Sequence, residues 1–324
     1  MSISPGKKFE IIAEVMGKQG NKLDVKELCA IAGVSRSGYY EWLKAEPARL
    51  KREAQDSADF VKILAAYKHR GYNKGGRGIQ MRLLRHDPPV VMNLKKVYRL
   101  MKKYGLKCPI RKANPYRRIM KALKENNYTK NLLNREFREH GPRSVLLTDI
   151  TYLKRKDGQF SYLSAIMDAY SKEILAYAVS DSIELDFVLE TVSLLMENHG
   201  SELKTDTLLH SDQGGHYTSY KFIAVLGNAE IRRSMSRRAN CWDNAPQESF
   251  FGHMKEEIDI SNCETHEQIE AVVNDWIDYY NNERYQWDLA KLSPREYYGY
   301  VMTSVYPLPF PAPKNIIDCE AHNG

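Results

Sequence analysis

Apolar residues recur at helical spacing in the segment from Asp24 to Lys44. Up to Ala32 they form one face of a predicted helix, which ends at Gly33. Ser35 then suits the N-cap of a second helix that extends to Lys44. Two helices joined by a short glycine turn are typical of a helix-turn-helix, whose second helix enters a DNA groove, and equally of an αα-hairpin that contacts no DNA. The pattern alone leaves both interpretations open.

A second helical module is predicted from about Ser57 to Leu106, after a polar stretch that ends at Asp56. Its last helix begins at Asn93, a good N-cap, and ends at Gly105. The apolar face of this helix consists of Leu94, Val97, Leu100 and Met101. The opposite face consists of Lys95, Lys96, Arg99, Lys102 and Lys103. Such a helix can lie along a DNA groove while its apolar stripe packs on the module core.

From about Gly141 the pattern changes to alternating strands and helices. Apolar and β-branched runs predict strands at 145–153, 159–168, 173–180, 207–211 and 230–234. Helical spacing predicts helices at 185–198, near 218–226 and from about 246. Asp157 and Gly158 mark a hairpin turn between the first two strands. Three antiparallel strands followed by alternating helices and strands predict an α/β domain with a mixed sheet.

The C-terminal part returns to a helical pattern. One helix is predicted from Thr265 to Asn281. A shorter helix begins at Ser293, which combines an N-cap with Pro294 at the first helical position and Glu296 as the capping-box acid. The last stretch, beginning YPLPFPAP, is rich in proline and is expected to be irregular.

The distribution of charge along the chain, more than the total, indicates a class of partner. The 324 residues carry a formal net charge of +7, and 43% of them are hydrophobic, as in ordinary globular proteins. Between Asn93 and Arg138 there are 15 Lys or Arg against two Glu, so this segment carries +13 and the remainder 7 − 13 = −6. Such a block predicts a polyanion partner, because cations placed on phosphates release condensed counterions. The alternative is a solvated helix face.

The cysteines and the hydropathy of the chain argue against a disulfide-linked, zinc-binding, membrane or secreted protein. The five cysteines form no CxxC pair, so we expect reduced thiols and neither a disulfide framework nor a structural zinc site. The longest apolar runs are too short to span a membrane, and residues 1–10 lack the apolar core of a signal peptide. We therefore expect a cytoplasmic protein.

Three acidic residues are candidate functional residues because of their positions. Asp149 lies inside the apolar strand VLLTDITYL, where an ionised carboxylate is costly unless it is paired or binds a metal. Asp212 follows a predicted strand and opens a Gly-Gly turn, at the strand end where α/β sheets place ligands. Glu248 lies in the first turns of a helix. Oxygen ligands of this kind suit Mg²⁺ or Mn²⁺, two of which support phosphoryl transfer on DNA.

Each acid also has a local explanation. Asp149 can be a buried hydrogen-bonded carboxylate, Asp212 a turn residue, and Glu248 a first-turn acid that complements the helix dipole. Only the combination favours catalysis.

The motifs around these acids resemble those of a known family. The sequences TDITYL, HSDQGGHYTS and SMSRRANCWDNAPQESFFGHMKEE are similar to the catalytic motifs of bacterial insertion-sequence transposases of the insertion-sequence-three family, within the superfamily of retroviral integrases. In that family 35 residues separate the second Asp from the Glu, as they separate Asp212 from Glu248. The resemblance extends from the helix-turn-helix pattern to YYNNERYQWDLAKLSPREYY and covers most of the chain.

The resemblance implies a fold and a division of the chain. We expect an RNase H-like mixed five-stranded sheet with flanking helices, preceded by helix-turn-helix modules. The expected parts are a helix-turn-helix-like module at 1–55, a second at 56–108, a basic linker at 109–140, an integrase-like catalytic core at 141–262, and a C-terminal helical extension with a Pro-rich tail at 263–324.

The resemblance also implies a reaction. A transposase of this type binds the terminal inverted repeats of its element, nicks DNA at a 3′ end and transfers the strand, using Mg²⁺ or Mn²⁺ held by Asp149, Asp212 and Glu248. It acts as a homo-oligomer on double-stranded DNA, in some cases fused to or accompanied by an upstream-frame protein. We accordingly expect a bacterial, nucleoid-associated protein with no membrane partner.

Further residues are predicted to contact DNA. Lys255 occupies the place of the family's basic residue, seven positions after Glu248, which is roughly 10 Å along the same helix face; its alternative is an ordinary surface lysine. The remaining candidates outside the basic helix are Arg36, Arg111, Lys112, Arg117, Arg118, His216 and Asn240. Asp243 and Asn244 suit helix capping. His210 and Asp168 are expected to be structural.

Two other functions stay open. A catalytically inactive, transposase-derived DNA-binding regulator would keep the basic modules but would not need the three acids. A nuclease of RNase H type would cleave without joining, although the 35-residue spacing and the helical modules disfavour it. The absence of a His-His-Cys-Cys module before the core argues against a retrovirus-like integrase.

Overall fold

A computed structural model describes residues 3–72, 74–109, 140–212, 214–235 and 245–312. The N-terminal part consists of α1 (Pro5–Met16), α2 (Val25–Ala32), α3 (Arg36–Lys44), α4 (Glu46–Lys68), the 3₁₀ turn η1 (His69–Gly71), α5 (Gly76–Leu83) and α6 (Leu94–Lys103). Residues 110–139 of the predicted linker and residues 313–324 of the predicted tail lie outside the described residues.

The two helices predicted from Asp24 to Lys44 are present. Asp24 and Glu27 form a capping box at the start of α2, in which each side chain accepts a hydrogen bond from the other's backbone N–H. Gly33 ends α2 with φ at +63°, a conformation that favours glycine. Ser35 caps α3 as predicted, by accepting from the N–H of Gly38. With α1, these helices enclose a small core of their own.

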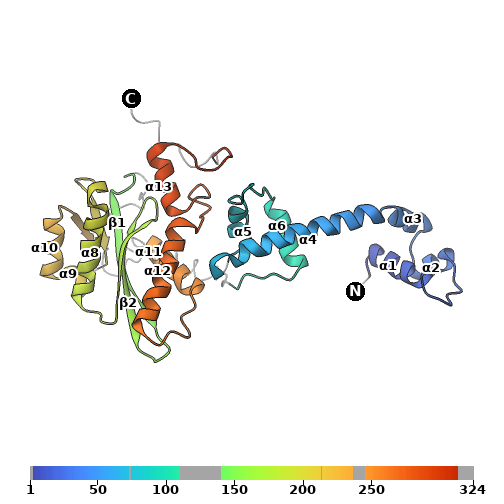
Figure 1. The fold of residues 1–324 in the computed structure, drawn as a ribbon, viewed down its shortest axis with the longest axis horizontal. Coiled ribbons are helices and arrows are strands. Elements are labelled where there is room, and N and C mark those ends of the chain that lie inside the picture. The colour runs from blue at the N-terminus through green and yellow to red at the C-terminus, as the bar shows by residue number, and fades with distance from the viewer. Residues whose placement is uncertain (1–2, 73, 110–139, 213, 236–244, 313–324) are drawn as a thin grey trace, which may run out of the picture.

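The second helical unit begins earlier than the sequence suggested. α4 is one helix of 23 residues that includes the polar stretch, so the border expected between residues 55 and 56 falls inside it. Figure 1 shows α4 as a long arm, with α1 to α3 at one end and α5 and α6 against the other. Ile63 of α4, Ile79 of α5 and Val97 of α6 are fully buried together. α5 approaches α6 closely at Gly76, where a Cβ would lie 2.5 Å from the ring of Tyr98.

The predicted mixed sheet is confirmed, with five strands in the order β3-β2-β1-β4-β5. The strands are β1 (Val145–Lys154), β2 (Phe160–Asp168), β3 (Ile174–Ser180), β4 (Leu208–Ser211) and β5 (Arg232–Met235). β1, β2 and β3 are antiparallel, and β4 and β5 run parallel to β1. The hairpin between β1 and β2 turns at Gly158, whose φ of +87° explains the glycine. β4 pairs only with residues 145–147, so the rest of β1 extends beyond it.

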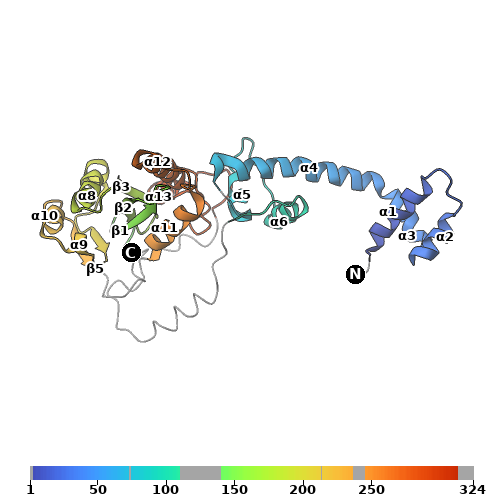
Figure 2. The ribbon, with the colours of Figure 1, turned by 90° about the horizontal axis from the view of Figure 1, so that it is seen from below.

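Helices cover both faces of the sheet (Figures 1 and 2). One face packs against α8 (Leu185–His199), α9 (Gly215–Thr218) and α10 (Tyr220–Asn228), with the 3₁₀ turn η2 (Gly200–Glu202) after α8. The other face packs against α11 (Ala245–Glu257) and α12 (His266–Asn282), and α13 (Pro294–Thr303) follows. Trp276 of α12 is fully buried between Phe250 and Tyr280. α12 therefore shares one core with the sheet, across the border expected at residue 262.

The second helical unit docks on α12 and α13 through charged contacts. The guanidinium of Arg70 donates hydrogen bonds to Asp278 at 2.8 Å and to Glu283 at 2.9 Å. Arg82 of α5 also donates to Glu283, at 3.0 Å. Arg85 pairs with Glu296 at 2.5 Å. These partly buried pairs hold the helical unit beside the sheet domain.

Among the described residues, none of the helices combines the length and the apolar character that crossing a membrane requires.

Candidate active site

Asp149 and Asp212 lie at matching positions on neighbouring strands. β1 and β4 pair in parallel up to Leu147 and His210, and each chain then continues for two residues to its aspartate. Neighbouring strands lie about 4.8 Å apart. The register therefore places the two aspartates side by side at the carboxyl end of β4.

The environment of Asp149 raises the pKa of its carboxyl group. Burial and, to a smaller extent, the negative charges of Asp212 and Glu248 raise the pKa of Asp149 to about 6. Two effects oppose this shift: the backbone N–H of Ile150 donates to Asp149 Oδ1 at 2.8 Å, and the positive charge of Lys255 lowers the pKa. Asp212, Glu248 and Lys255 thus all act electrostatically on Asp149. A divalent cation bound among the carboxylates would stabilise their negative charges.

Asp212 is exposed and shapes the turn that follows β4. Its Oδ1 accepts a hydrogen bond from the N–H of Gly214 at 2.8 Å. A Cβ at Gly214 would lie 2.9 Å from this same oxygen, so a larger residue there would displace the Asp212 carboxylate. The local explanation from the sequence is therefore correct, and it leaves the second oxygen, Oδ2, outside this turn.

Glu248 is exposed in the first turn of α11, and its neighbour Gln247 fixes the helix to the sheet. The Gln247 side chain is fully buried, and its Nε2 donates to the backbone carbonyl of Ala165 at 3.2 Å. Ala165 of β2 pairs directly with Asp149 of β1. Gln247 thus holds the start of α11 level with Asp149. The sequence analysis did not identify Gln247, although it lies in the quoted motif beside Glu248.

Lys255 lies near Asp149 at the free edge of β1. Its Nζ is 4.6 Å from the centroid of the Tyr152 ring. Burial lowers the pKa of Lys255, and the charge of Asp149 raises it. Tyr152 was not identified from the sequence, although it lies three residues after Asp149 in the first motif. Its side chain is 62% exposed and packs edge-on against Phe160, which leaves the Lys255 ammonium beside an open surface.

The histidines and the remaining acid of the motifs have structural partners. The Nε2 of His216 donates to the carbonyl of Ile183 at 2.6 Å, which occupies one of its two nitrogens. His210 is buried beside Ser234, and Asp168 is a fully buried turn acid that accepts from Ser171. These two residues are structural, as expected.

Several predicted residues cannot be placed. Asn240, Asp243 and Asn244 of the third motif, and Arg111, Lys112, Arg117 and Arg118 of the linker, lie outside the described residues.

The basic face of α6 is partly engaged within the protein. Arg99 makes two hydrogen bonds to Asp56 of α4, at 2.6 and 2.7 Å, and Lys103 reaches the same carboxylate at 3.0 Å. Lys96 pairs with Asp59 of α4. Within the described parts of the chain, Lys95 and Lys102 make no ion pair, and both are exposed. The face thus divides into residues that hold α6 on α4 and residues that face outward.

Arg36 occupies a suitable position for a DNA contact. It is the first residue of α3, directly after the Ser35 cap, and it is exposed. In a helix-turn-helix the N-terminal residues of the second helix contact the base edges.

The candidate ligand atoms are of the type that a hard divalent cation binds. Asp149, Asp212 and Glu248 offer only carboxylate oxygens, the ligands that Mg²⁺ and Mn²⁺ prefer. In the described part of the chain, however, no three His, Cys, Asp or Glu side chains stand close enough together to hold a metal ion. Metal binding would therefore need the exposed side chains of Asp212 and Glu248 to turn towards Asp149.

Family comparisons cover most of the chain. The family model of an integrase core domain matches residues 139–241, a second integrase core domain model matches residues 248–299, and the model of an HTH-like domain matches residues 54–114.

Curated relatives align over nearly their whole length. The chain is 31% identical over 274 residues to the insertion element IS600 uncharacterized 31 kDa protein of Shigella sonnei, covering 82% of this chain and 96% of that protein. It is also 31% identical over 278 residues to the putative transposase InsK for insertion sequence element IS150 of Escherichia coli K12, covering 84% and 92%. Among solved structures, the HTLV-2 integrase catalytic core domain in complex with magnesium matches with 15% identity and a TM-score of 0.37, over 48% of this chain and 97% of that one.

Proposed function

The chain belongs to the insertion-sequence-three family of transposases, with an integrase core and a helix-turn-helix-like DNA-binding domain, and from this premise we propose that it nicks DNA at the 3′ ends of its element and transfers those ends to another strand. The observation that carries the proposal is the register of β1 and β4, which sets Asp149 and Asp212 at matching positions. Glu248 completes the set, because its charge acts on the same Asp149 carboxyl group.

Asp149, Asp212 and Glu248 would hold one or two Mg²⁺ or Mn²⁺ ions, which supply a competent oxygen nucleophile and stabilise the leaving oxygen. Gln247 contributes by fixing the start of α11 level with Asp149, next to Glu248. The raised pKa of Asp149, which burial causes first and the charges of Asp212 and Glu248 second, supports this role, because a bound cation would stabilise the ionised carboxylate.

Lys255 is suited to hold a phosphate of the DNA end. Its ammonium lies on the Tyr152 ring beside the carboxylates, and Tyr152 is mostly exposed. The Lys255 ammonium is attracted by the charge of Asp149, and a DNA phosphodiester would supply a closer negative charge. The Lys255 side chain would then align the scissile strand, while the carboxylates engage the reacting oxygens.

The helical parts would bind the terminal inverted repeats. Arg36 lies where a helix-turn-helix contacts base edges, and Lys95 and Lys102 share one exposed face of α6, two turns apart. Joining two element ends requires at least two DNA sites, so we propose that the active form is a homo-oligomer on DNA. An upstream-frame protein of the same element is a further partner in this proposal.

The test is DNA cleavage by the full chain with Asp149→Asn, Asp212→Asn or Glu248→Gln, on duplexes that carry the inverted repeats flanking the gene. Each variant should abolish Mg²⁺-dependent nicking and strand transfer while binding the ends nearly as well as the wild type. Added Mg²⁺ should also raise the unfolding temperature of the wild type and not of Asp149→Asn, because a ligand stabilises only the state that binds it. Wild-type cleavage by any of the three variants would refute the assignment. If the wild-type chain binds the ends but does not cleave them under any metal condition, the alternative of an inactive DNA-binding regulator is correct.

A further inference from the structure

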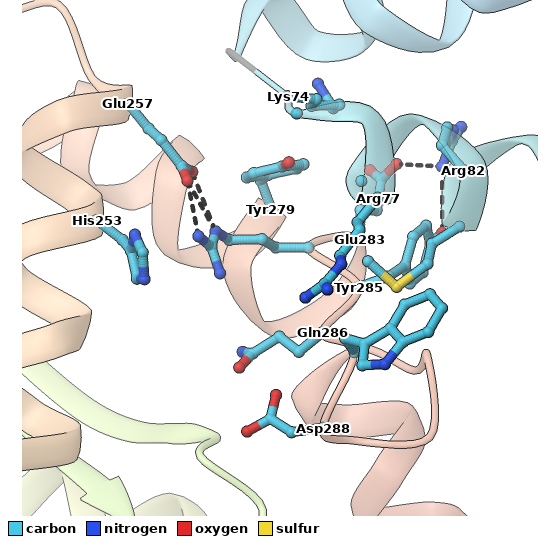
Figure 3. A pocket seen from close by; sticks show the side chains of 15 residues that line it. Lys74, Arg77, Arg82, His253, Glu257, Tyr279, Glu283, Tyr285, Gln286 and Asp288 are labelled. Atoms are coloured by element: carbon cyan, nitrogen blue, oxygen red, sulfur yellow. Dashed lines mark hydrogen bonds and ion pairs between the residues drawn. The ribbon is translucent and has the colours of Figure 1, made fainter. Parts of the chain in front are cut away.

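A cavity of 380 Å³ lies between the second helical unit and the sheet domain. Figure 3 shows α5 on one side, with Arg77 and Arg82, and α11 on the other, with His253 and Glu257. The segment after α12, including Tyr285 and Gln286, lies between them. A cavity of this size lies within the range of about 300 to 1,000 Å³ that holds small ligands. This volume is enough for one nucleotide and too small for a duplex.

The carboxylates in this cavity are already paired. Glu257 accepts from Arg284 at 2.8 and 3.0 Å, and Glu283 accepts from Arg82 at 3.0 Å. Asp288 pairs with Lys172. The anions of the lining are therefore neutralised by partners of their own.

Two cations of the lining remain. Arg77 is exposed on α5, and Lys74 is 6% exposed at the start of the same segment. Lys74 donates to the backbone carbonyls of His69 and Tyr72, which uses two of its three N–H bonds. Within the described residues, no carboxylate forms an ion pair with Lys74 or Arg77.

The start of α5 adds to this positive potential. The helix begins after Gly75, which has no side chain to cap the first N–H groups, and both Gly75 and Gly78 line the cavity. Uncapped N–H groups at a helix start attract anions. The buried Lys74 ammonium and the helix start thus favour a phosphate at one end of the cavity.

An exposed aromatic side chain forms the other end. Trp287 is 43% exposed, although large apolar side chains are usually covered. Arg77 lies 5.3 Å and Lys291 5.1 Å from its ring centroid. Long flexible cations on an indole can move aside for a base, which stacks on aromatic side chains whatever its sequence.

The cavity leads towards the candidate catalytic helix. A second cavity of 240 Å³ shares His253, Arg284 and Gln286 with the first. It is also lined by Pro246, Ser249 and Phe250 of α11. A strand held in the first cavity can therefore continue onto the start of α11.

We propose that the cavity bounded by Lys74, Arg77 and Trp287 binds one unpaired nucleotide of a DNA strand, with its phosphate at the start of α5 and its base on Trp287. The proposal rests on the proposed function, since it names the part of the DNA substrate that this surface takes. Unpairing at the element end would place the freed strand in the cavity, with the adjoining phosphates along the start of α11.

The test measures the binding of two probes to the full chain in buffer with EDTA: a blunt duplex of fixed sequence, and the same duplex with a short single-stranded oligothymidine tail. The wild type should bind the tailed duplex at least about fivefold more tightly, the lower limit for stacking one base. Trp287→Leu and Arg77→Gln should each bring this ratio near one and leave the affinity for the blunt duplex unchanged. Oligothymidine should also quench tryptophan fluorescence in the wild type and not in Trp287→Leu.

Matched controls come from α10. Tyr220→Leu removes an aromatic side chain that is 86% exposed, and Lys221→Gln removes an adjacent exposed cation; both should keep the wild-type ratio. The proposal fails if the tail adds no affinity, if Trp287→Leu keeps the ratio, or if thymidine monophosphate competes as well as the tailed duplex does. Asp149→Asn should keep the tail preference, because binding in EDTA needs no metal. If the catalytic assignment of Asp149, Asp212 and Glu248 is wrong, this binding result is unaffected. If the cavity does not bind a nucleotide, the cleavage results are unaffected.

Discussion

The side-chain amide of Gln247 donates a hydrogen bond to the carbonyl of Ala165, 3.2 Å away, and Ala165 is the strand partner of Asp149. The residue next to Glu248 is thus fixed to the residue opposite Asp149. This contact joins the third carboxylate, which lies on a helix, to the first, which lies on a strand. The geometry of the candidate active site depends on it.

Gln247→Ala should lower cleavage more than it lowers stability. It removes one buried hydrogen bond, worth about 0.5 to 1.5 kcal/mol. A displacement of Glu248 by about 1 Å can cost roughly 100-fold in rate. We expect a higher Mg²⁺ concentration for half-maximal cleavage, with unchanged DNA affinity. Glu256→Gln, an exposed change on the same helix, is the control and should leave the Mg²⁺ dependence unchanged. An unaltered Mg²⁺ dependence in Gln247→Ala would show that Gln247 has no positioning role.

Lys255→Gln should remove one phosphate contact. The slope of log affinity against log salt concentration should then fall by roughly 0.7 to 0.9 for a DNA end, because each neutralised phosphate releases counterions. Lys255→Arg keeps the charge on the Tyr152 ring and should keep the slope. Fluorescence anisotropy over a series of salt concentrations measures both. Equal slopes for the wild type and Lys255→Gln would identify Lys255 as an ordinary surface lysine.

The two groups of cations on α6 should behave differently when neutralised. Lys95→Gln with Lys102→Gln should flatten the salt dependence of DNA binding, since both side chains are exposed and share one face of the helix. Stability should hardly change. If this double variant binds DNA with the wild-type salt dependence, the outward face of α6 is only solvated surface.

Arg99→Gln should mainly destabilise the unit of α4, α5 and α6. It leaves Asp56, which is 4% exposed, without the two hydrogen bonds that Arg99 donates. Hydrogen exchange of the α4 and α6 amides should become faster, whereas the amides of β1 and β2 should exchange as before. Unchanged exchange in α6 would mean that this ion pair does not hold the helices together.

The stability of the same unit should depend on acid pH. The hydrogen bonds and charges of Arg99 and Lys103 hold the pKa of Asp56 well below its usual range. A carboxyl group with a depressed pKa stabilises the fold above its ordinary pKa of roughly 4, and this stabilisation is lost as pH falls through the folded-state value. Exchange of α6 amides should therefore rise as the solution is acidified below about pH 4, and Asp56→Asn should weaken this dependence. Asp181→Asn, at an exposed position, serves as the control.

The sequence by itself determined the elements of this protein. Caps and breakers such as Ser35, Asn93 and Gly105 act locally, so the helices they bound could be predicted closely. The apolar and β-branched runs of β1 and β2 are likewise local properties of the chain, and they predicted both strands. The order and spacing of Asp149, Asp212 and Glu248 are properties of the chain, and so they were visible before any fold was known.

Only the tertiary structure decided which side chains meet. The contacts of Gln247 with Ala165, of Lys255 with Tyr152 and of Arg99 with Asp56 join residues 43 to 103 positions apart, and no local pattern encodes such pairs. The polar stretch before Ser57 is helical because α4 supplies acids to α6 and apolar residues to its core. The cavity between α5 and α11 exists because the helical unit docks on α12, which brings Arg77 to Trp287.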